Sequence, residues 1–504
     1  MDNISNSSEI KGQIIQNSFW NVTGSIINRV GGFILIILLS RILMPEGFGR
    51  YSIAMTISLF FITFSDMGIN QTLIRYVSLG INKKNSKSSA YFKYLFKIKF
   101  IVTILLSGFL ILVSYPLSVY IFRDFNLFIP LLIMGFYVFL ISLISFLEAL
   151  FFIGRNIKYV SIKEFVSLII KTGIVLAIGY IASSDYELIG LFLLFVLLSI
   201  LVLFFYFYLT KRIYPQLFED KLNKIDKKEI KKSILSLNVQ NISVMIIYQA
   251  GIILLGAFLA EKYVGYYNSY LVLVTSISGL FSFSYVFLPI MTNLKKEKFK
   301  SFLKKIFRLF FIILLPLSFG LSVLSRYFIT TLYGEGYLSA WVSLSILAFL
   351  IPCLFGIDLS LSIFSSRNKQ KIFSKIMVFS AGLFLVLSFI IIKILLKFSG
   401  EAAVIGISGL TLIIWIFCFI SSIRLMKKEF NVNILSSWIF KPLFSCIIMS
   451  IFLHLFLNYL GHMDLTKGLL VILFGALVYF FLMVLTKGIN KEDFFLLKRI
   501  CKLK

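Results

Sequence analysis

The chain has 504 residues, of which 59% are apolar and only 14% are charged, and its formal net charge is +28. Soluble globular domains are about 45–50% apolar and about 25% charged, so a soluble enzyme is excluded. The apolar residues come in blocks long enough to cross a hydrocarbon core of about 30 Å. The sequence lacks the short alternating segments that are typical of a transmembrane β-barrel. We therefore expect an all-α membrane protein.

Fourteen apolar segments in chain order predict about fourteen transmembrane helices. The connections on the side of the N-terminus hold 40 of the 50 Lys and Arg residues, whereas those on the opposite side hold 8. Because Lys and Arg collect on the cytoplasmic side, both termini are expected to be cytoplasmic. The positive charge then faces anionic membrane lipids and does not indicate nucleic-acid binding. The predicted spans are 14–40, 51–78, 100–121, 127–150, 160–183, 187–209, 235–259, 264–291, 306–326, 338–365, 373–396, 402–423, 439–460 and 465–486.

The connection after the first span is repeated after the seventh. Leu43, Gly49 and Tyr51 recur 216 residues later as Leu259, Gly265 and Tyr267. Six spans separate the copies, so both halves enter the membrane in the same direction, as in transporters built from parallel repeats. This predicts two pseudo-symmetric six-helix lobes at 1–215 and 216–425. Two extra helices and a basic cytoplasmic tail follow at 426–504.

Polar or small residues follow one face of the first, second, seventh and eighth spans, which correspond to each other in the repeat. A helix turns about 100° per residue, so residues at i, i+4 and i+7 share a face. The glycines on these faces, such as Gly24 and Gly31, suit either close helix packing or a cavity. The amide and hydroxyl side chains favour a water-filled central cavity, and those expected to line it are Asn21, Asn28, Asn70, Gln240, Asn268 and Thr275.

Four charged residues, Arg29, Asp66, Lys171 and Asp358, are predicted to lie inside spans. A charge at the bilayer centre costs about 2.5–3.5 kcal/mol, so each needs a partner or water. Arg29 and Asp66 either form an ion pair between adjacent helices, or Arg29 binds an anion in the cavity. Glu148 lies near the inner end of its span, where snorkelling lowers the cost. Asp66, Asp358 and Glu148 are the candidates for coupling transport to an ion.

Enzymatic and ATP-driven mechanisms find no support in the sequence. It lacks a GxxxxGK[ST] phosphate-binding loop and a legible catalytic triad or carboxylate pair. Its two histidines and four cysteines show no metal-ligand spacing. We therefore expect no catalytic residues, no metal and no cofactor, and we expect transport that is passive or driven by an ion gradient or the membrane potential.

Several short motifs resemble a known family. They are RILMPEGFGRY at 41–51, DMGIN at 66–70, LIRY at 73–76 and LYGEGY at 332–337. They resemble the polysaccharide transporter family, the Wzx-type O-antigen and capsule flippases of the multidrug/oligosaccharidyl-lipid/polysaccharide exporter superfamily. The resemblance implies a MATE-like fold of two six-helix lobes around a cavity lined by spans one, two, seven and eight.

The resemblance also implies a function. An undecaprenyl-pyrophosphate-linked oligosaccharide would move from the inner to the outer leaflet of the bacterial cytoplasmic membrane by alternating access. It would serve O-antigen or capsule synthesis, with the polymerase and glycosyltransferases of the same pathway as candidate partners. Arg29, and after it Lys171, would bind the pyrophosphate.

Two alternatives stay open within the same fold, namely a cation-coupled multidrug exporter and a lipid II-type flippase. Lipid II flippases have a more strongly cationic cavity, whereas the seventh span here has no Arg or Lys. A polysaccharide polymerase or lipid-linked glycosyltransferase is a third alternative, which the short outer loops disfavour.

Overall fold

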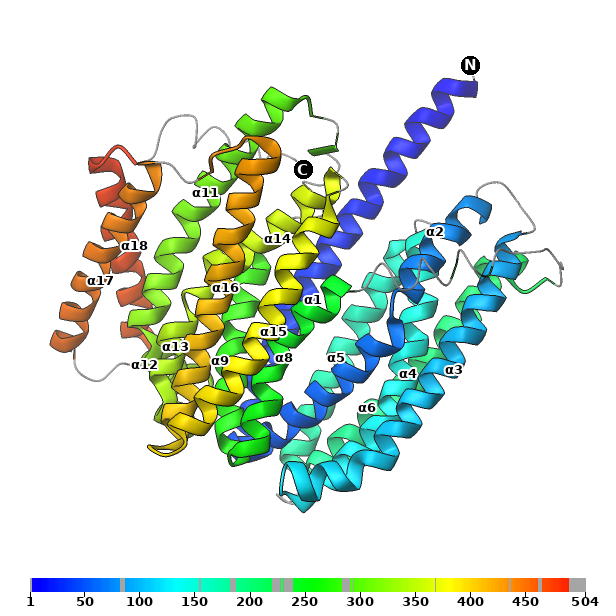
Figure 1. The fold of residues 1–504 in the computed structure, drawn as a ribbon, viewed down its shortest axis with the longest axis horizontal. Coiled ribbons are helices and arrows are strands. Elements are labelled where there is room, and N and C mark those ends of the chain that lie inside the picture. The colour runs from blue at the N-terminus through cyan, green and yellow to red at the C-terminus, as the bar shows by residue number, and fades with distance from the viewer. Residues whose placement is uncertain are drawn as a thin grey trace. The chain divides into compact units, whose positions relative to one another are not determined.

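The computed structural model describes most of the chain, and its residues form helices and turns without a β-strand among the described ones (Figure 1). Contacts divide the chain into two compact units, 1–265 and 266–504, and each is described by itself. The predicted lobes and the predicted pair of helices with a basic tail at 426–504 stay predictions, and residues 489–504 of that tail lie outside the described residues. Those residues are 2–81, 87–153, 156–181, 187–219, 227, 230, 239–282, 291–292, 294–367, 369–434, 437–460 and 465–488.

The N-terminal unit is a bundle of long helices. Its first helix turns back on itself at Met44, where the backbone has φ 55° and ψ 175° just before Pro45. Figure 1 shows the two arms of α1 in dark and medium blue. The helices of this unit are α1 (Asp2–Asp66), α2 (Ile69–Ile81), α3 (Lys87–Pro116), η1 (Leu117–Ile121), η2 (Phe125–Leu127), α4 (Phe128–Ile153), α5 (Ile157–Ile181), α6 (Glu187–Ile213), η3 (Pro215–Leu217) and α8 (Val239–Phe258).

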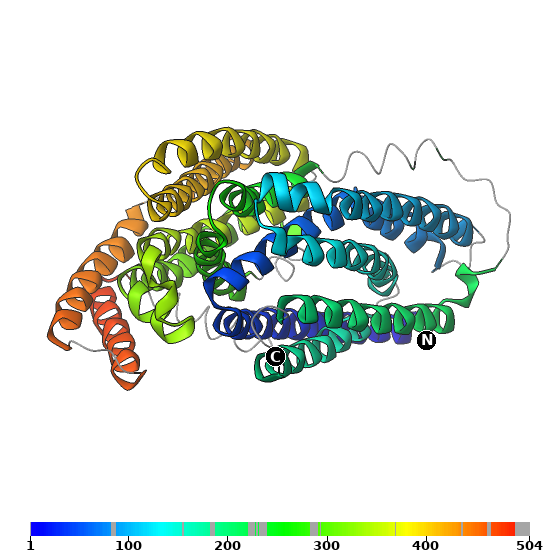
Figure 2. The ribbon, with the colours of Figure 1, turned by 90° about the horizontal axis from the view of Figure 1, so that it is seen from below.

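The C-terminal unit is also helical, and α9 (Glu261–Leu280) leads into it. Its last two helices, α17 and α18, pack against each other (orange and red in Figures 1 and 2). The other elements are α11 (Lys296–Val323), α12 (Ser325–Leu332), η4 (Glu335–Ala340), α13 (Trp341–Leu347), α14 (Leu350–Ser366), α15 (Gln370–Leu395), α16 (Gly400–Phe430), η5 (Ser437–Ile439), α17 (Phe440–Leu460) and α18 (Leu465–Leu485).

Each of the fourteen predicted spans falls on a helix of the described chain. Within the described ranges, ten helices are long and apolar enough to cross a membrane, or eleven if the pair Glu335–Leu347 and Leu350–Ser366, bent by 48°, is one span. The first of the ten, Thr23–Ser78, holds two predicted spans because α1 turns at Met44. The helices α5 and α9 do not belong to the ten. The prediction of an all-α, multi-pass membrane protein is confirmed.

The first arm of α1 packs along α5 through small residues. A Cβ on Gly24 would meet Ser161, one on Gly31 would meet Leu168, and one on Gly179 would meet Ile42. The two members of each pair are 137 positions apart in sequence, so the helices run parallel and in step. This agrees with the expectation that spans one and five cross in the same direction. Gly24 and Gly31 therefore serve helix packing and do not line a cavity.

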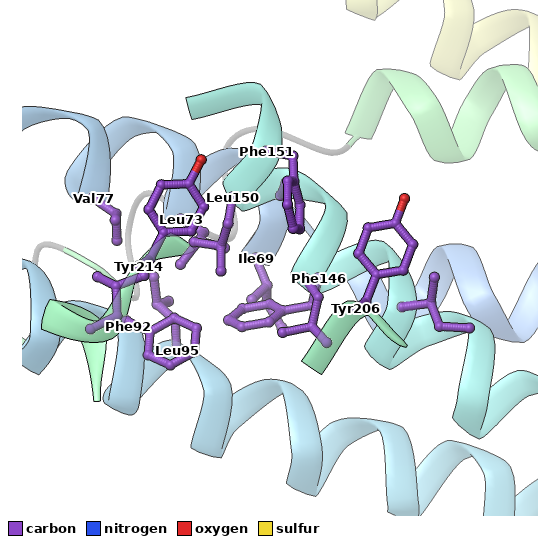
Figure 3. Packing of buried hydrophobic residues seen from close by; sticks show 14 of the residues in the cluster. Ile69, Leu73, Val77, Phe92, Leu95, Phe146, Leu150, Phe151, Tyr206 and Tyr214 are labelled. Carbon is purple, nitrogen blue, oxygen red and sulfur yellow. The ribbon is translucent and has the colours of Figure 1, made fainter. Parts of the chain in front are cut away.

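A buried apolar cluster holds the amphipathic helix α2 against its neighbours (Figure 3). Ile69, Leu73 and Val77 recur every four residues, so they lie on one face of α2, and each is 1% exposed or less. They pack with Phe92 and Leu95 of α3 in the same cluster, which also includes residues of α4 and α6. The part of the second predicted span that follows Asp66 is thus part of the folded core.

In the C-terminal unit, the LYGEGY motif fixes α9 to the connection between α12 and η4. The Tyr333 hydroxyl donates a hydrogen bond to Ser269 O over 2.9 Å, and the Tyr270 hydroxyl donates to Tyr337 O. Gly334 has φ +96°, a conformation that a residue without Cβ adopts readily. The motif has a structural role here, because its tyrosines are buried.

Candidate functional site

The two copies of the repeated connection contact each other through their glycines. A Cβ on Gly49 would lie 1.9 Å from Glu261 O, and a Cβ on Gly265 would lie 2.2 Å from Pro45 O. Gly49 and Gly265 are 216 positions apart, as are Pro45 and Glu261. The glycine of each copy therefore packs against the backbone at the start of the other copy. The sequence repeat corresponds to a symmetric contact at this turn.

A charged cluster and close helix packing adjoin these glycines. Arg50 Nε donates a hydrogen bond of 2.6 Å to Asp124 Oδ2, and the carboxyl of Glu261 lies within electrostatic reach of both. Thr56 Oγ1 donates to Gln249 Oε1 over 3.2 Å, between the second arm of α1 and α8. The connections after spans one and seven thus pack directly against each other. We call this contact the glycine turn (Pro45–Arg50 and Glu261–Gly265).

Adding one methyl group should open the glycine turn. Gly49→Ala and Gly265→Ala each place a Cβ against rigid backbone, so we expect each to lower the free energy of unfolding by about 1–3 kcal/mol. Thermal unfolding of the purified protein measures this change. Gly32→Ala is the matched control, because a Cβ there meets nothing within 4 Å. If Gly49→Ala and Gly32→Ala are equally stable, the contact is not close-packed.

At its other end, the second span is broken. The helix α1 ends at Asp66 and α2 begins at Ile69, with Met67 at φ 36° and Gly68 at φ 84° between them. The Asn70 backbone N–H donates to Asp66 Oδ1 over 3.1 Å, which caps α2. The arm from Pro45 to Asp66 is about 33 Å long at 1.5 Å per residue, enough to cross the core. That Asp66 lies mid-span stays a prediction, and the structure places Asp66 at the end of this arm, next to the break.

Lys99 of α3 reaches this break and is 0% exposed. Its ammonium donates to Ser65 O over 3.1 Å and to Ser65 Oγ over 3.3 Å, and it lies 4.0 Å from Asp66 Oδ1. Asp66 thus pairs with Lys99, and the ion pair between Arg29 and Asp66, one of the two alternatives from the sequence, is wrong. Lys99 directly precedes the predicted span 100–121, so its sequence position suggested a solvated lysine. The apolar residues at 94–96 and 98, which continue the helix from Lys87, indicate that the helix is already buried there.

Hydroxyl and amide groups complete the surroundings of the break. Ser65 Oγ donates to Ser142 Oγ over 2.7 Å, and Asn70 Nδ2 donates to Ser145 Oγ over 3.3 Å. The other polar atom of this amide, Asn70 Oδ1, is buried without a hydrogen-bond partner among the described residues. We call Ser65, Asp66, Asn70 and Lys99 the break cluster. It brings together two of the predicted site residues, Asp66 and Asn70.

Arg29 is half-buried and makes no ion pair or hydrogen bond with the described part of the chain. Gly24 and Gly31 of the same helix face α5, and Arg29 lies about 140–160° around the helix from them at 100° per residue. Its guanidinium therefore points away from α5. Asn28 beside it is exposed. Arg29 is a charge without a protein partner in the described structure, within the first predicted span.

The remaining predicted residues lie apart from the break cluster. The ammonium of Lys171 is 5.5 Å from the centre of the Phe195 ring, a cation–π contact. Thr275 donates its hydroxyl to Leu271 O over 2.8 Å within its own helix. Asn268 and Asp358 are half-buried, and each has a partner. The side chains of Asn21 and Gln240 lie outside the described residues.

Glu148 belongs to a buried ion cluster. Lys163 of α5 forms ion pairs with both Glu148 of α4 and Glu164, and the exposed fractions of the three side chains are 12%, 18% and 31%. The Lys163 ammonium also lies 5.9 Å from the centre of the buried Tyr206 ring. Lys163 compensates the Glu148 carboxylate, and the expectation that snorkelling lowers the cost of Glu148 stays a prediction. The place of Lys163 at the start of the predicted span 160–183 gave no sign of this pairing.

Comparison with known proteins finds a matching family and several structures of similar fold. A family described as "Polysaccharide biosynthesis protein" matches residues 38–342, and no curated protein matches the chain. A structure of "Lipid II flippase MurJ, inward closed conformation" aligns with a TM-score of 0.69 at 16% identity, over 94% of this chain and 98% of its own.

Two further similar structures are MATE transporters. An inward-facing MATE family transporter of the MOP superfamily has a TM-score of 0.56 at 13% identity, over 82% of this chain and 99% of its own. A point mutant of the Vibrio cholerae MATE transporter VcmN has a TM-score of 0.51 at 13% identity, over 84% of this chain and 99% of its own. At these identities the three structures establish the fold and leave the substrate open.

Proposed function

Because the chain belongs to the polysaccharide biosynthesis protein family, we propose that it is a flippase for polyprenyl-pyrophosphate-linked oligosaccharide. It moves the repeat unit from the inner to the outer leaflet of the bacterial cytoplasmic membrane for O-antigen or capsule synthesis. The flippase and MATE neighbours share its fold, which supports alternating access as the mechanism. We propose transport without enzymatic chemistry and without a cofactor.

The observation that supports this proposal most directly is the lack of an ion-pair partner for Arg29 among the described residues. Its guanidinium has no ion pair with the described residues, although a charge near the bilayer centre costs about 2.5–3.5 kcal/mol. An anionic ligand offsets that cost when it binds. The planar guanidinium donates paired hydrogen bonds that match phosphate oxygens. A pyrophosphate between the lipid and the sugar is such an anion, and Lys171 is the second candidate to hold it.

The sugar head needs hydrogen bonds in place of water on its way through the membrane. Amide side chains both donate and accept them, and hydroxyls do the same. In this proposal the polar residues of the four equivalent spans supply these bonds, and the polyprenyl tail stays in the lipid. Transport coupled to a proton would use Asp66, Asp358 or Glu148. The residues assigned to the sugar are Asn21, Asn28, Asn70, Gln240, Asn268 and Thr275.

Deleting the gene and analysing the lipids of the cell tests the function. We expect one lipid-linked repeat unit to accumulate on the cytoplasmic leaflet, together with loss of the surface polysaccharide. Increased sensitivity to drugs with unchanged polysaccharide would favour the multidrug exporter. Accumulation of the lipid-linked peptidoglycan precursor would favour a lipid II flippase. Extraction and mass spectrometry of the lipids distinguish the three outcomes.

The proposed orientation places both termini in the cytoplasm. In a chain whose native cysteines have been replaced, Asn85→Cys and Asn223→Cys should resist an impermeant maleimide in intact cells, and Gly47→Cys should react. Permeabilised cells are the control, in which all three should react. Labelling of the first two but not the third in intact cells would reverse the orientation.

A further inference from the structure

The break cluster concentrates negative charge in a buried place. The last carbonyl groups of a helix lack partners within that helix and carry the negative end of its dipole. The arm of α1 ends here, so Ser65 O and its neighbours are such carbonyls, and the Asp66 carboxylate lies directly after them. A cation at this point would stabilise both.

Lys99 supplies that cation from a different helix. Its side chain is 0% exposed, so the ammonium is held among protein groups. It lies 3.1 Å from a backbone carbonyl oxygen, 3.3 Å from a hydroxyl oxygen and 4.0 Å from a carboxylate oxygen. Carbonyl oxygens at the ends of discontinuous membrane helices are groups that bind Na⁺ in other transporter folds. The buried, unpartnered Asn70 Oδ1 adds a further oxygen to the same cluster.

We propose that Lys99 is a tethered cation that holds the position of a monovalent metal ion in the break cluster. The break between α1 and α2 then keeps its geometry without Na⁺ or K⁺. Removal of the Lys99 side chain leaves the oxygen atoms in place around an empty volume and creates a site for either ion. This inference is independent of the proposed function, because it concerns the stability of the N-terminal unit.

Thermal unfolding of the purified full chain in NaCl, KCl or choline chloride of equal ionic strength tests the proposal. The wild type should have the same Tm in all three salts. Lys99→Ala should unfold at a lower Tm in choline chloride and regain roughly 2–4 °C in saturating NaCl or KCl. Lys97→Ala, an exposed lysine of the same helix, is the matched control and should show no dependence on the cation.

A second substitution tests whether the ion binds beside Asp66. Asp66→Asn in the Lys99→Ala background removes the carboxylate and should abolish the difference between salts. If Lys99→Ala cannot be purified folded in any salt, Lys99→Ser, which also leaves the volume of the ammonium open and adds only one small hydroxyl, is compared in the same way. Equal Tm values in all salts for the variant that folds would overturn the proposal and leave Lys99 as an ordinary ion-pair partner of Asp66.

Discussion

Arg29→Ala is expected to reduce surface polysaccharide at least about tenfold while the protein remains in the membrane. Charge-assisted hydrogen bonds contribute about 1.5–3 kcal/mol each, and about 1.4 kcal/mol corresponds to a factor of ten in binding. Arg29→Lys should retain part of the export, because it keeps the charge and loses the planar pair of donors. Immunodetection of the polymer on intact cells, normalised to the amount of flippase in the membrane fraction, measures the effect.

The structure supplies the controls for this substitution. Arg212→Ala removes an exposed arginine at the end of α6 and should leave export unchanged. Because Asp66 pairs with Lys99 and not with Arg29, the double variant Arg29→Ala with Asp66→Ala should export no better than Arg29→Ala. Normal export by the double variant would mean that Arg29 is a structural charge, and the anion site would then have to be sought at Lys171.

Lys163→Ala is expected to lower the free energy of unfolding by about 3–5 kcal/mol, the largest effect on stability that we predict. Removing one partner of a buried ion pair leaves an uncompensated charge, and Lys163 compensates both Glu148 and Glu164. Denaturant or thermal unfolding in detergent measures the change. Lys158→Ala, an exposed lysine of the same helix α5, should change the stability by less than about 1 kcal/mol.

A neutralised double variant distinguishes charge from packing at Lys163. Lys163→Met together with Glu148→Gln removes one charge of each sign and keeps most of the volume, so much of the lost stability should return. A Lys163→Ala protein as stable as the wild type would show that the two carboxylates are solvated and that the ion cluster does not stabilise the fold.

The fold was largely predictable because the features that indicate it, hydropathy and the distribution of charge, are averages over long stretches of sequence. A block of about 20 apolar residues has few alternatives to a membrane-spanning helix, and the alternation of Lys and Arg constrains the number of spans. The repeat of Gly49 at Gly265 coincides with a close contact that the sequence did not predict, because only a residue without Cβ fits where two backbones meet. These features depend on residue type and spacing alone.

The partners of the charged residues could not be predicted in the same way. Lys99 and Lys163 lie beside or within the first residues of the predicted spans 100–121 and 160–183, where a sequence window cannot tell a solvated lysine from a buried one. Their burial depends on neighbours from other helices, Ser65 and Glu148 respectively. The break after Asp66 was also missed, because Met67 and Gly68 are apolar or small and continue the hydropathy of the span.

Reconstitution of the purified protein in liposomes that contain a polyprenyl-pyrophosphate-linked oligosaccharide tests the central claim most directly. A membrane-impermeant enzyme or lectin that recognises the sugar reports the fraction exposed on the outer leaflet. The account predicts that wild-type protein makes the inner-leaflet pool accessible, whereas protein-free and Arg29→Ala liposomes expose only the outer-leaflet fraction. If the wild-type protein leaves the inner pool protected under an imposed ion gradient and without one, the chain is not a flippase for this lipid.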